Sequence, residues 1–431
     1  MKKALLLSLV LVLIAGLFVG CGSSKTATKN NKVTIRFWQA GGDDKASIPK
    51  MKEIIKKFEN ENKDIEVEFQ ATPWSENPHD KFSTSIAGGN IADLLIVGSP
   101  FDTVLANNGA VISLDQYIDS SFKSDMMETF LNQSVYEGKR AEINKKIISL
   151  PIYGSTRTII YNKDLLKAEN IPEPVDKGWS MDDFKKYALA LTKDTNGDGV
   201  IDQYGFGTSA KYTSQFLPFI WDLGGEICNA DITKATTTTP EWKEGISYFV
   251  DLIKKASPPG SVNLDLQEIQ KLFSQGKVAI MIDAMDFANK IINEPSIKDK
   301  VGIGQMPIGK KQTSFAGADV FVITKQSKHP AEAWKLLRFI LNTDNESEYC
   351  KTVGFMPVLK SSAKDPYFTG DIVRKGYSQA LTYGKFYVKS DKSSAITTIL
   401  KAEVQNIIGN KKTVDKALTD IQNQVNTALA Q

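Results

Sequence analysis

The sequence predicts an α/β protein built as two lobes. Strand-like and helix-like segments alternate along the chain, and this alternation favours parallel sheets covered by helices. Two short segments, 94–97 and 278–282, are apolar throughout, as expected of strands that are buried on both faces. The length of 431 residues corresponds to two or three domains at roughly 150 residues each.

The N-terminal segments predict a strand–helix–strand unit. Apolar and polar residues alternate over 33–37, apolar residues recur at helical spacing over 48–58, and the alternation returns over 65–69. A helix over 80–87 is expected before the buried strand at 94–97. Further strands are expected at 159–161 and 278–282, and helices at 164–169, from Ser180, near Pro240 and from Pro330.

Composition and charge exclude several classes of protein. The formal net charge is +3, and it falls to +1 without the first twenty residues. The chain therefore lacks the strong positive electrostatic field that binds nucleic acid. The two histidines, His79 and His329, and the three cysteines are too few for a His- or Cys-rich metal centre. The sequence contains no nucleophile elbow, phosphate-binding loop or dinucleotide fingerprint, so neither an enzymatic activity nor a required cofactor is expected. A secreted glycosidase that uses two of the fifty acidic residues is the alternative.

The N-terminus has the features of an export signal. Two lysines precede an apolar run over 4–19, and Gly20-Cys21 follow, which fits a cleaved signal better than a membrane-spanning helix. A cysteine at this place resembles the lipidated residue of a bacterial lipobox. We therefore expect a lipoprotein signal peptide at 1–20, lipidation of Cys21 and a flexible tether over 21–32. The protein is then exported and lipid-anchored to the outer face of the cytoplasmic membrane. The alternative is an ordinary cleaved signal with an incidental cysteine.

Three of the six tryptophans lie where a ligand could meet an aromatic surface. Trp38 is at the end of the first strand, Trp74 follows the second, and Trp221 is expected in a loop. Ligands of open α/β sheets bind beyond the carboxyl ends of the strands. The polar residues that flank these tryptophans or the strand ends are Gln39, Asp93 and Asp222. Indole faces stack on sugar rings, and amides and carboxylates bond hydroxyl groups, so the pattern favours a sugar. The alternative interpretation is that each tryptophan merely covers the edge of a lobe.

A segment over 194–202 resembles a calcium-binding loop. Oxygen ligands stand at alternate positions, and glycine stands at the sixth position. The twelfth position is Gly205, so the bidentate acid of such loops is missing. A structural Ca²⁺ ion and a metal-free turn are both consistent with this pattern. The candidate calcium ligands are Asp194, Asn196, Asp198, Val200 and Asp202.

A series of short segments resembles the family 1 extracellular solute-binding proteins of ABC importers, the group that includes maltose-binding protein. The segments are VTIRFW (33–38), IAGGNIADL (86–94), LPIYG (150–154), IYNKDL (160–165), GWSMDDF (178–184), LFSQGKVAIM (272–281), GAD (317–319) and GFMP (354–357). The resemblance covers almost all of the chain after the tether. Each segment is weakly specific by itself, and their common order carries the resemblance.

The resemblance implies a two-lobed periplasmic-binding-protein fold of type II, with several hinge crossings and the ligand in the cleft between the lobes. Lobe 1 is expected over 33–154 plus 313–358, and lobe 2 over 155–312 plus 359–431. Ligand binding would close the lobes about the hinge. The closed form would then dock on the permease subunits of an ABC importer, without chemistry of its own.

The resemblance also implies which residues line the cleft. The predicted ligand-binding residues are Trp38, Gln39, Trp74, Asp93, Tyr153, Trp221, Asp222, Met285, Asp286, Gly317 and Asp319. Tryptophans would stack on sugar rings, Asp and Gln would bond hydroxyl groups, and Gly317 would let backbone amides approach the ligand. The expected function is the capture of a mono- or oligosaccharide for import. A non-sugar solute, or a sensor kinase in place of the permease, are the alternatives.

Overall fold

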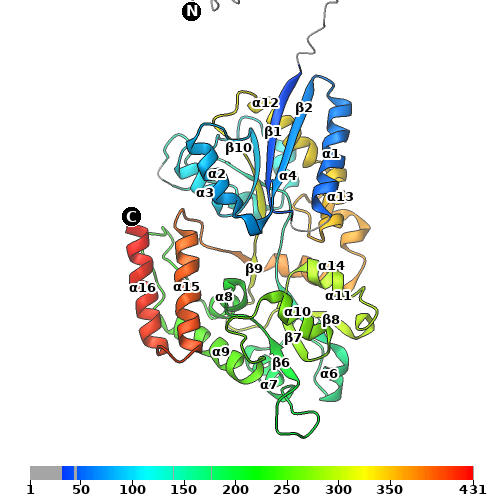
Figure 1. Cartoon of the computed structure of the whole chain (residues 1–431), viewed down its shortest axis with the longest axis vertical. Coiled ribbons are helices and arrows are strands. Elements are labelled where there is room, and N and C mark those ends of the chain that lie inside the picture. The colour runs from blue at the N-terminus through cyan, green and yellow to red at the C-terminus, as the bar shows by residue number, and fades with distance from the viewer. Residues whose placement is uncertain (1–31, 43–45, 139, 176, 431) are drawn as a thin grey trace, which may run out of the picture.

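The computed structural model describes residues 32–42, 46–138, 140–175 and 177–430. These residues form two α/β lobes, with the N-terminal strands in one lobe and the C-terminal helices in the other (Figure 1). The predicted two-lobed α/β fold is therefore confirmed. The expected signal peptide (1–20), Cys21 and the tether as far as residue 31 lie outside the described residues.

Lobe 1 is built on a mixed sheet. Its strands are β1 (Val33–Ala40), β2 (Ile65–Thr72), β3 (Leu94–Gly98), β4 (Leu150–Pro151) and β10 (Asp319–Ile323). The strand order is β2-β1-β3-β10-β4. β1 pairs in parallel with β2 and β3, whereas β10 pairs antiparallel with β3 and β4. A strand from the second half of the chain therefore lies between two strands of the first half.

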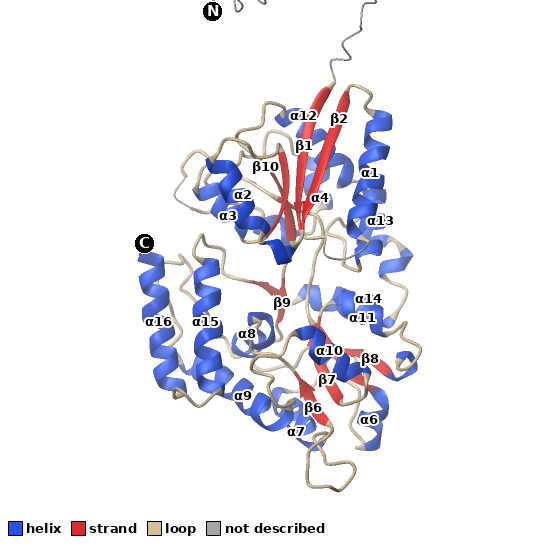
Figure 2. Cartoon of the chain, in the orientation of Figure 1, coloured by secondary structure: helices blue, strands red, loops and turns tan. Residues whose placement is uncertain are grey.

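Helices cover both faces of this sheet (Figure 2). On one face, α1 (Ser47–Glu61), α12 (Pro330–Ile340) and α13 (Thr343–Val353) share a core that includes Phe37. On the other face, α2 (Pro78–Ala87) and α3 (Phe101–Asn107) share a core that includes Phe82. Successive side chains of a strand point to opposite faces, so Phe37 and its neighbour Trp38 belong to different cores. The short helices α4 (Ser120–Asp125) and α5 (Glu128–Gln133) follow before β4.

Lobe 2 is built on a second sheet. Its strands are β5 (Thr158–Asn162), β6 (Tyr204–Gly207), β7 (Val278–Asp283) and β8 (Val301–Gly304), in the order β6-β7-β5-β8. One face is covered by α7 (Met181–Ala190), α8 (Thr213–Asp222), α9 (Pro240–Ala256), α15 (Ser393–Ile408) and α16 (Val414–Ala430). The other face is covered by α10 (Leu266–Ser274), α11 (Met285–Ile291) and α14 (Ile372–Thr382). Helix α6 (Lys163–Ala168) follows β5 directly.

The expectation that Trp221 lies in a loop is wrong, because this residue is in the last turn of α8. Pro218 lies inside the same helix. Proline normally interrupts a helix interior, so its presence in the sequence argues against a helix at this position. The helix is buried on all sides, which also removes the amphipathic signal.

The segments that connect the lobes pair side by side at the hinge. Gly154, between β4 and β5, exchanges backbone hydrogen bonds with Met356, at N···O distances of 2.7 and 3.1 Å. Ser155 pairs in the same way with Gly317, at 2.9 and 2.8 Å, in the connection that leads into β10. Strands β9 (Ser314–Ala316) and β11 (Gly384–Phe386) add a parallel pair beside them. Segments far apart in the sequence therefore form one backbone-bonded hinge.

Two sequence features have simple structural outcomes. Cys228 and Cys350 are free, buried thiols that belong to different cores. Within the described ranges, no helix combines the length and the apolar character that crossing a bilayer requires.

Residues 384–392, which we call the strap, leave lobe 2 and contact lobe 1 before the chain returns through α15. The Nζ atom of Lys389 donates hydrogen bonds to the backbone carbonyls of Gln133 and Val135. It also lies 3.8 Å from Oδ2 of the fully buried Asp102. Burial lowers the pKa of Lys389, and the negative charge of Asp102 opposes that change. Lys389 therefore fastens the strap to lobe 1.

Replacing Lys389 with methionine is expected to lower the free energy of unfolding by about 3 kcal/mol. The buried Asp102 carboxylate would lose its cation, and two carbonyls would lose their donor. Urea unfolding followed by circular dichroism measures the change. Lys392→Met is the matched control in the same strap. The ion pair between Lys392 and Asp391 is long, at 3.9 Å, and partly exposed, so it contributes little. The control is expected to change stability by less than about 0.5 kcal/mol, and equal effects of both substitutions would contradict the anchoring role.

Candidate ligand-binding cleft

A cavity of about 550 Å³ lies between the lobes. Strands β1, β2 and β3 run parallel and end at Ala40, Thr72 and Gly98, so the loops that follow them meet at one edge of the sheet. Lobe 2 contributes the first turns of α10 and α11. The lining residues are Gln39, Ala40, Gly41, Gly42, Ser47, Trp74, Ile96, Tyr153, Gln267, Asp286, Asp319, Tyr349, Val353 and Phe355.

Trp74 forms an aromatic wall of this cavity. Its side chain is 42% exposed. Glycines leave room for the indole: a Cβ atom on Gly41 would lie 2.6 Å from Nε1, and one on Gly98 would lie 3.1 Å from Cη2. Gly41 has a φ of 90°, a conformation that glycine adopts readily. The turn after β1 therefore makes space for an indole at the carboxyl edge of the sheet.

His79 packs against the same indole. The two rings meet edge to face with centroids 5.3 Å apart, and His79 also stacks on Phe101 at 3.9 Å. Its Nε2 atom accepts a hydrogen bond from the N–H of Gly98 at 3.3 Å. Burial lowers the pKa of His79 to about 4, and the charge of Asp80 opposes that change. The ring is therefore neutral at pH 7 and keeps its acceptor nitrogen.

Tyr153 and Asp319 form a hydrogen-bonded pair in the cavity wall. The Tyr153 hydroxyl donates to Oδ2 of Asp319. The tyrosine ring stacks on Phe355, with centroids 4.4 Å apart and an interplanar angle of 15°. Burial raises the pKa of the Asp319 carboxyl to about 6, and the hydrogen bond from Tyr153 opposes that rise. Both residues adjoin hinge segments, so the hinge positions this part of the wall.

Gln39 presents a buried acceptor to the cavity. The side chain is 4% exposed, and its Nε2 atom lies 3.5 Å from the hydroxyl oxygen of Tyr349. Its Oε1 atom has no hydrogen-bond partner among the described residues. A buried amide oxygen in this state costs free energy, and a ligand that donates a hydrogen bond would recover it.

Lobe 2 faces the cavity with Gln267 and Asp286. Asp283, the last residue of β7, is buried nearby and accepts a hydrogen bond from Nε2 of Gln270 at 2.8 Å. Burial raises the pKa of Asp283 to about 6, although the positive charge of Arg157 lowers it. The negative charge of Asp286 adds to the rise. This side of the cleft is therefore also acidic.

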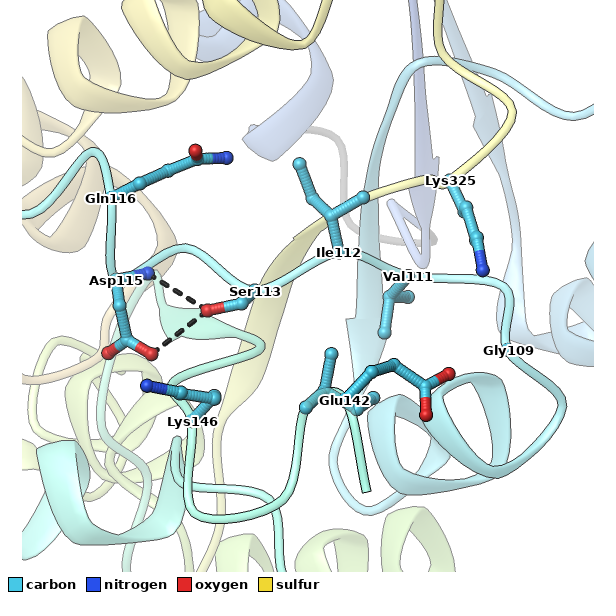
Figure 3. A pocket seen from close by; sticks show the side chains of 10 residues that line it. Gly109, Val111, Ile112, Ser113, Asp115, Gln116, Glu142, Lys146 and Lys325 are labelled. Carbon is cyan, nitrogen blue, oxygen red and sulfur yellow. Dashed lines mark hydrogen bonds between the residues drawn. The ribbon is translucent and has the colours of Figure 1, made fainter. Parts of the chain in front are cut away.

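A second cavity, of about 420 Å³, lies on lobe 1 alone (Figure 3). It is lined by residues between 109 and 116, residues between 142 and 146, and Lys325. Ser113 donates through Oγ to Oδ2 of Asp115 at 2.9 Å. No residue of lobe 2 is among the described residues that line it. Movement of the lobes cannot enclose a ligand there, so the cavity between the lobes is the stronger candidate.

Comparisons with known proteins agree with this arrangement. Residues 43–347 match the family model of bacterial extracellular solute-binding proteins. The chain belongs to this family. The resemblance inferred from the short sequence segments is thereby confirmed.

The relatives of this solute-binding protein match over most of its length. A binding protein of Brucella abortus (strain 2308) is 30% identical over 413 residues, which cover 94% of this chain and 96% of that protein. The arabinooligosaccharide-binding protein of Bacillus subtilis (strain 168) is 24% identical over 370 residues, covering 83% and 81%. The structure of the sugar-binding protein MalE from Xanthomonas citri has a TM-score of 0.80 at 19% identity, covering 92% of this chain and 98% of that chain. This structural likeness shows the shared fold.

The cleft of this solute-binding protein brings together part of the predicted residue set. The predicted residues that line it are Gln39, Trp74, Tyr153, Asp286 and Asp319. Their contact with a ligand stays a prediction.

Trp38 and Asp93 lie elsewhere, so their predicted position in the cleft is wrong. Trp38 is on the opposite face of β1 from Gln39 and packs against Phe82, with centroids 5.8 Å apart. Asp93 precedes β3 and therefore lies at the end of the strand away from the cleft. Its Oδ1 atom accepts a hydrogen bond from Ser327 at 2.6 Å, which gives it a structural role.

Trp221 and Asp222 are also outside the cavity, in the buried end of α8. Trp221 is 2% exposed and stacks on Phe315 with centroids 5.8 Å apart. The Nζ atom of Lys385, in the strap, lies 5.1 Å from the centre of its ring. Asp222 is buried and accepts a hydrogen bond from the N–H of Gly309 at 3.1 Å. Burial raises the pKa of Asp222 to about 7. Neither side chain is available to a ligand in this cavity.

Met285 and Gly317 are the other two predicted residues that do not line the cavity. Met285 is 2% exposed and belongs to the core beneath α11, while the adjacent Asp286 lines the cavity. Gly317 uses both its N–H and its carbonyl in the hinge pairing with Ser155. Its backbone amide is therefore committed to the hinge and does not serve a ligand.

Several lining residues escaped the sequence analysis. They are Ala40, Ser47, Ile96, Gln267, Tyr349, Val353 and Phe355, together with the backbone turn at Gly41 and Gly42. Phe355 lies in the GFMP segment that carries the family resemblance, so it had a sequence signal. Tyr349 had none, because it is one polar-tipped aromatic residue within an ordinary helix, α13.

The loop over 194–202 uses its acidic oxygens as backbone caps. Asp194 accepts hydrogen bonds from the N–H groups of Gly197 and Gly199, both at 2.7 Å. The backbone hydrogen bond from Gly199 is the main cause that lowers the pKa of Asp194. In the part of the chain that the structure describes, no three Asp, Glu, His or Cys side chains are grouped to hold a metal ion. Calcium binding by this loop stays a prediction.

The Asp319 carboxyl is expected to make stability depend on pH. Its pKa of about 6 in the folded protein exceeds the value of about 3.9 for an unfolded aspartate. The folded protein therefore binds more protons between these values, and the free energy of unfolding falls as pH rises from about 4 to about 7. Asp319→Asn should flatten this fall by about 3 kcal/mol, as measured by urea unfolding at several pH values.

Tyr153→Phe provides the opposite test in the same pair. Without the hydroxyl donor, the pKa of Asp319 should rise further, and the loss of stability should extend to higher pH. Parallel pH profiles for the wild type and both variants would contradict the electrostatic role of the pair.

Proposed function

We propose that this protein captures a mono- or oligosaccharide in the cleft between its lobes and delivers it to the permease of an ABC importer. The observation that carries the proposal is the cavity between the lobes, where aromatic rings stand beside buried hydrogen-bond acceptors. Both lobes contribute lining residues, so closure about the hinge would enclose a ligand.

The aromatic residues suit the flat, apolar faces of sugar rings. Trp74 exposes its indole to the cavity, and Tyr153 and Phe355 form a stacked pair in the same wall. Aromatic rings in such sites bury a large area at little entropic cost, because only two side-chain torsions are fixed. Family membership supports the same ligand class, since the Bacillus subtilis relative is named for an arabinooligosaccharide and the Xanthomonas citri neighbour for a sugar.

The polar residues suit hydroxyl donors. Gln39 and Asp319 offer acceptors from lobe 1, and Asp286 offers a carboxylate from lobe 2. Hydrogen bonds to charged acceptors in a closed cleft are stronger than those between neutral groups in water. The proposed task is capture and presentation without turnover of the ligand, as in the solute-binding family.

Export and lipid anchoring are part of the same proposal. The family described as extracellular supports export of the chain. Cys21 at the end of the apolar N-terminal run would carry the lipid that holds the protein at the outer face of the cytoplasmic membrane. An anchored binding protein would stay close to its permease.

Trp74→Ala is expected to weaken sugar binding by about 1–3 kcal/mol, or roughly 5- to 150-fold in Kd, because a stacking surface is removed. Calorimetric titration with mono- and oligosaccharides, with an assay for product release, identifies the sugar and measures the loss. Trp38→Phe is the matched control, since Trp38 lies outside the cavity on the other face of the sheet. An unchanged affinity in Trp74→Ala would remove this residue from the site, and release of hydrolysis products would contradict the proposed function.

Cys21→Ser is expected to release the protein from the membrane fraction into the soluble extracellular or culture fraction. The serine hydroxyl cannot carry the thioether-linked lipid of a lipoprotein. Cell fractionation with immunoblotting and metabolic labelling with a radioactive fatty acid measure the two effects. Cys228→Ser, at a buried thiol of lobe 2, is the control and should stay with the membranes. Full membrane retention and labelling of Cys21→Ser would contradict lipidation at this residue.

A further inference from the structure

Among the described residues that line the cleft, the charged side chains are acidic. Asp319 comes from lobe 1 and Asp286 from lobe 2, and no lysine or arginine is among the described residues that line the cavity. Asp283, buried at the end of β7 three residues before Asp286, adds a third carboxyl to this part of lobe 2. The cavity therefore presents carboxylates from both lobes to whatever binds there.

Two basic residues on the adjoining segments, Arg157 and Lys50, interact with groups of the protein itself. Arg157, at the hinge, donates a hydrogen bond to Oγ of Ser155 at 3.0 Å, and its positive charge stabilises the Asp283 carboxylate. Lys50 lies one helical turn after Ser47 on α1 and forms an ion pair with Glu53 at 2.8 Å. The Nζ atom of Lys50 lies between Glu53 and Glu348, and the Nε atom of Arg157 is buried without a hydrogen-bond partner among the described residues.

Tyr153 and Gln39 in the lobe 1 wall each direct an acceptor oxygen toward the cavity. The Tyr153 hydroxyl donates its hydrogen bond to Asp319, so it offers a ligand only an acceptor oxygen. The Nε2 atom of Gln39 is directed to Tyr349, while its Oε1 atom is buried and unpartnered among the described residues. Hydroxyl and ammonium groups can donate to these oxygens. A carboxylate or phosphate can only accept, so it would leave them unsatisfied.

The N-terminus of helix α1 adds positive charge beside the cavity, which opposes the negative charge of the carboxylates. The helix begins at Ser47 beside the cavity, and a helix N-terminus carries about half a positive charge. Each carboxylate carries a full negative charge, and Asp286 occupies the first turn of α11, where it offsets that helix dipole. The sum of these charges is negative.

We infer that the cleft takes neutral or amine-bearing saccharides and rejects saccharides that carry a carboxylate or a phosphate. The inference rests on the proposed function and names the class of sugar within it. A negative charge brought beside Asp286 and Asp319 is repelled, and it loses its hydration when the lobes close. An ammonium group instead gains charge-assisted hydrogen bonds to the same carboxylates.

Calorimetric titration of the purified wild-type protein with matched sugars tests this inference. The probes are glucose, glucosamine and glucuronate, the corresponding galactose series, and the disaccharides built from each. In the series whose neutral member binds, the uronate should bind at least tenfold more weakly, and the amino sugar at least as tightly as the neutral sugar. Raising the NaCl concentration from about 0.05 to about 0.5 M should reduce the difference in affinity between the neutral sugar and the uronate, because salt screens charge repulsion.

Titration of the Asp286→Asn variant tests whether Asp286 causes the discrimination between the neutral sugar and the uronate. The ratio of uronate to neutral Kd should fall several-fold in this variant, whatever happens to the affinity for the neutral sugar. Asp319→Asn should act in the same direction, which keeps the test valid if one variant fails to fold. Glu244→Gln, at an exposed position on α9, is the control and should leave the ratio unchanged.

The outcomes separate the inference from the proposed function. Equal binding of a neutral sugar and its uronate, or a ratio that stays constant in both variants, would overturn the inference and leave the proposed function standing. Binding of the uronate alone would also overturn it. An absence of binding across all series would count against the proposed function itself, and the inference would fall with it.

Discussion

The backbone pairing at the hinge is the contact on which the rest of the molecule depends. Gly154 bonds to Met356 and Ser155 bonds to Gly317, so segments separated by long stretches of sequence are held edge to edge. Tyr153 precedes the first of these residues, and Asp319 follows the last by two positions. The same pairing that joins the lobes therefore brings the phenol and the carboxylate of the cavity wall together. Any rotation at the hinge must move this pair relative to Gln267 and Asp286 of lobe 2, which couples the shape of the cavity to the relation between the lobes.

The cavity is built from groups whose burial is costly. Burial raises the pKa of both Asp319 and Asp283 to about 6, and Gln39 keeps an amide oxygen without a partner among the described residues. In a packed core such groups would only destabilise the fold. Here Asp319 and Gln39 line a space that a ligand with many hydrogen-bond donors would fill, and the low dielectric that penalises them also strengthens each bond they would make. Unsatisfied polar groups at the cleft lower the stability of the free protein, and a ligand that satisfies them would bind more tightly for that reason.

The fold and part of the cleft were predictable from local patterns. The strands and helices followed from apolar periodicity, and Trp74 was found because it comes directly after β2, at the carboxyl edge. The predictions for Trp38 and Asp93 failed for geometric reasons. Trp38 is on the face of β1 that points away from the cavity, and Asp93 is at the end of β3 that lies away from the cavity. Trp221 was misplaced because Pro218 conceals a buried helix. Tyr349 could not be found locally, since α13 is brought beside the cavity by long-range packing against α1.

The position of β10 has a consequence for how the chain acquires its structure. The strands of the lobe 2 sheet all lie within residues 158–304, whereas the lobe 1 sheet needs β10, residues 319–323, between β3 and β4. Lobe 1 therefore cannot complete its sheet until the whole lobe 2 sheet has been synthesised. Closing the loop between β3 and β10 also costs more chain entropy than pairing neighbours, and sheets of such non-local topology fold slowly. The lobe 1 sheet thus remains without the strand that joins β3 to β4 for most of synthesis.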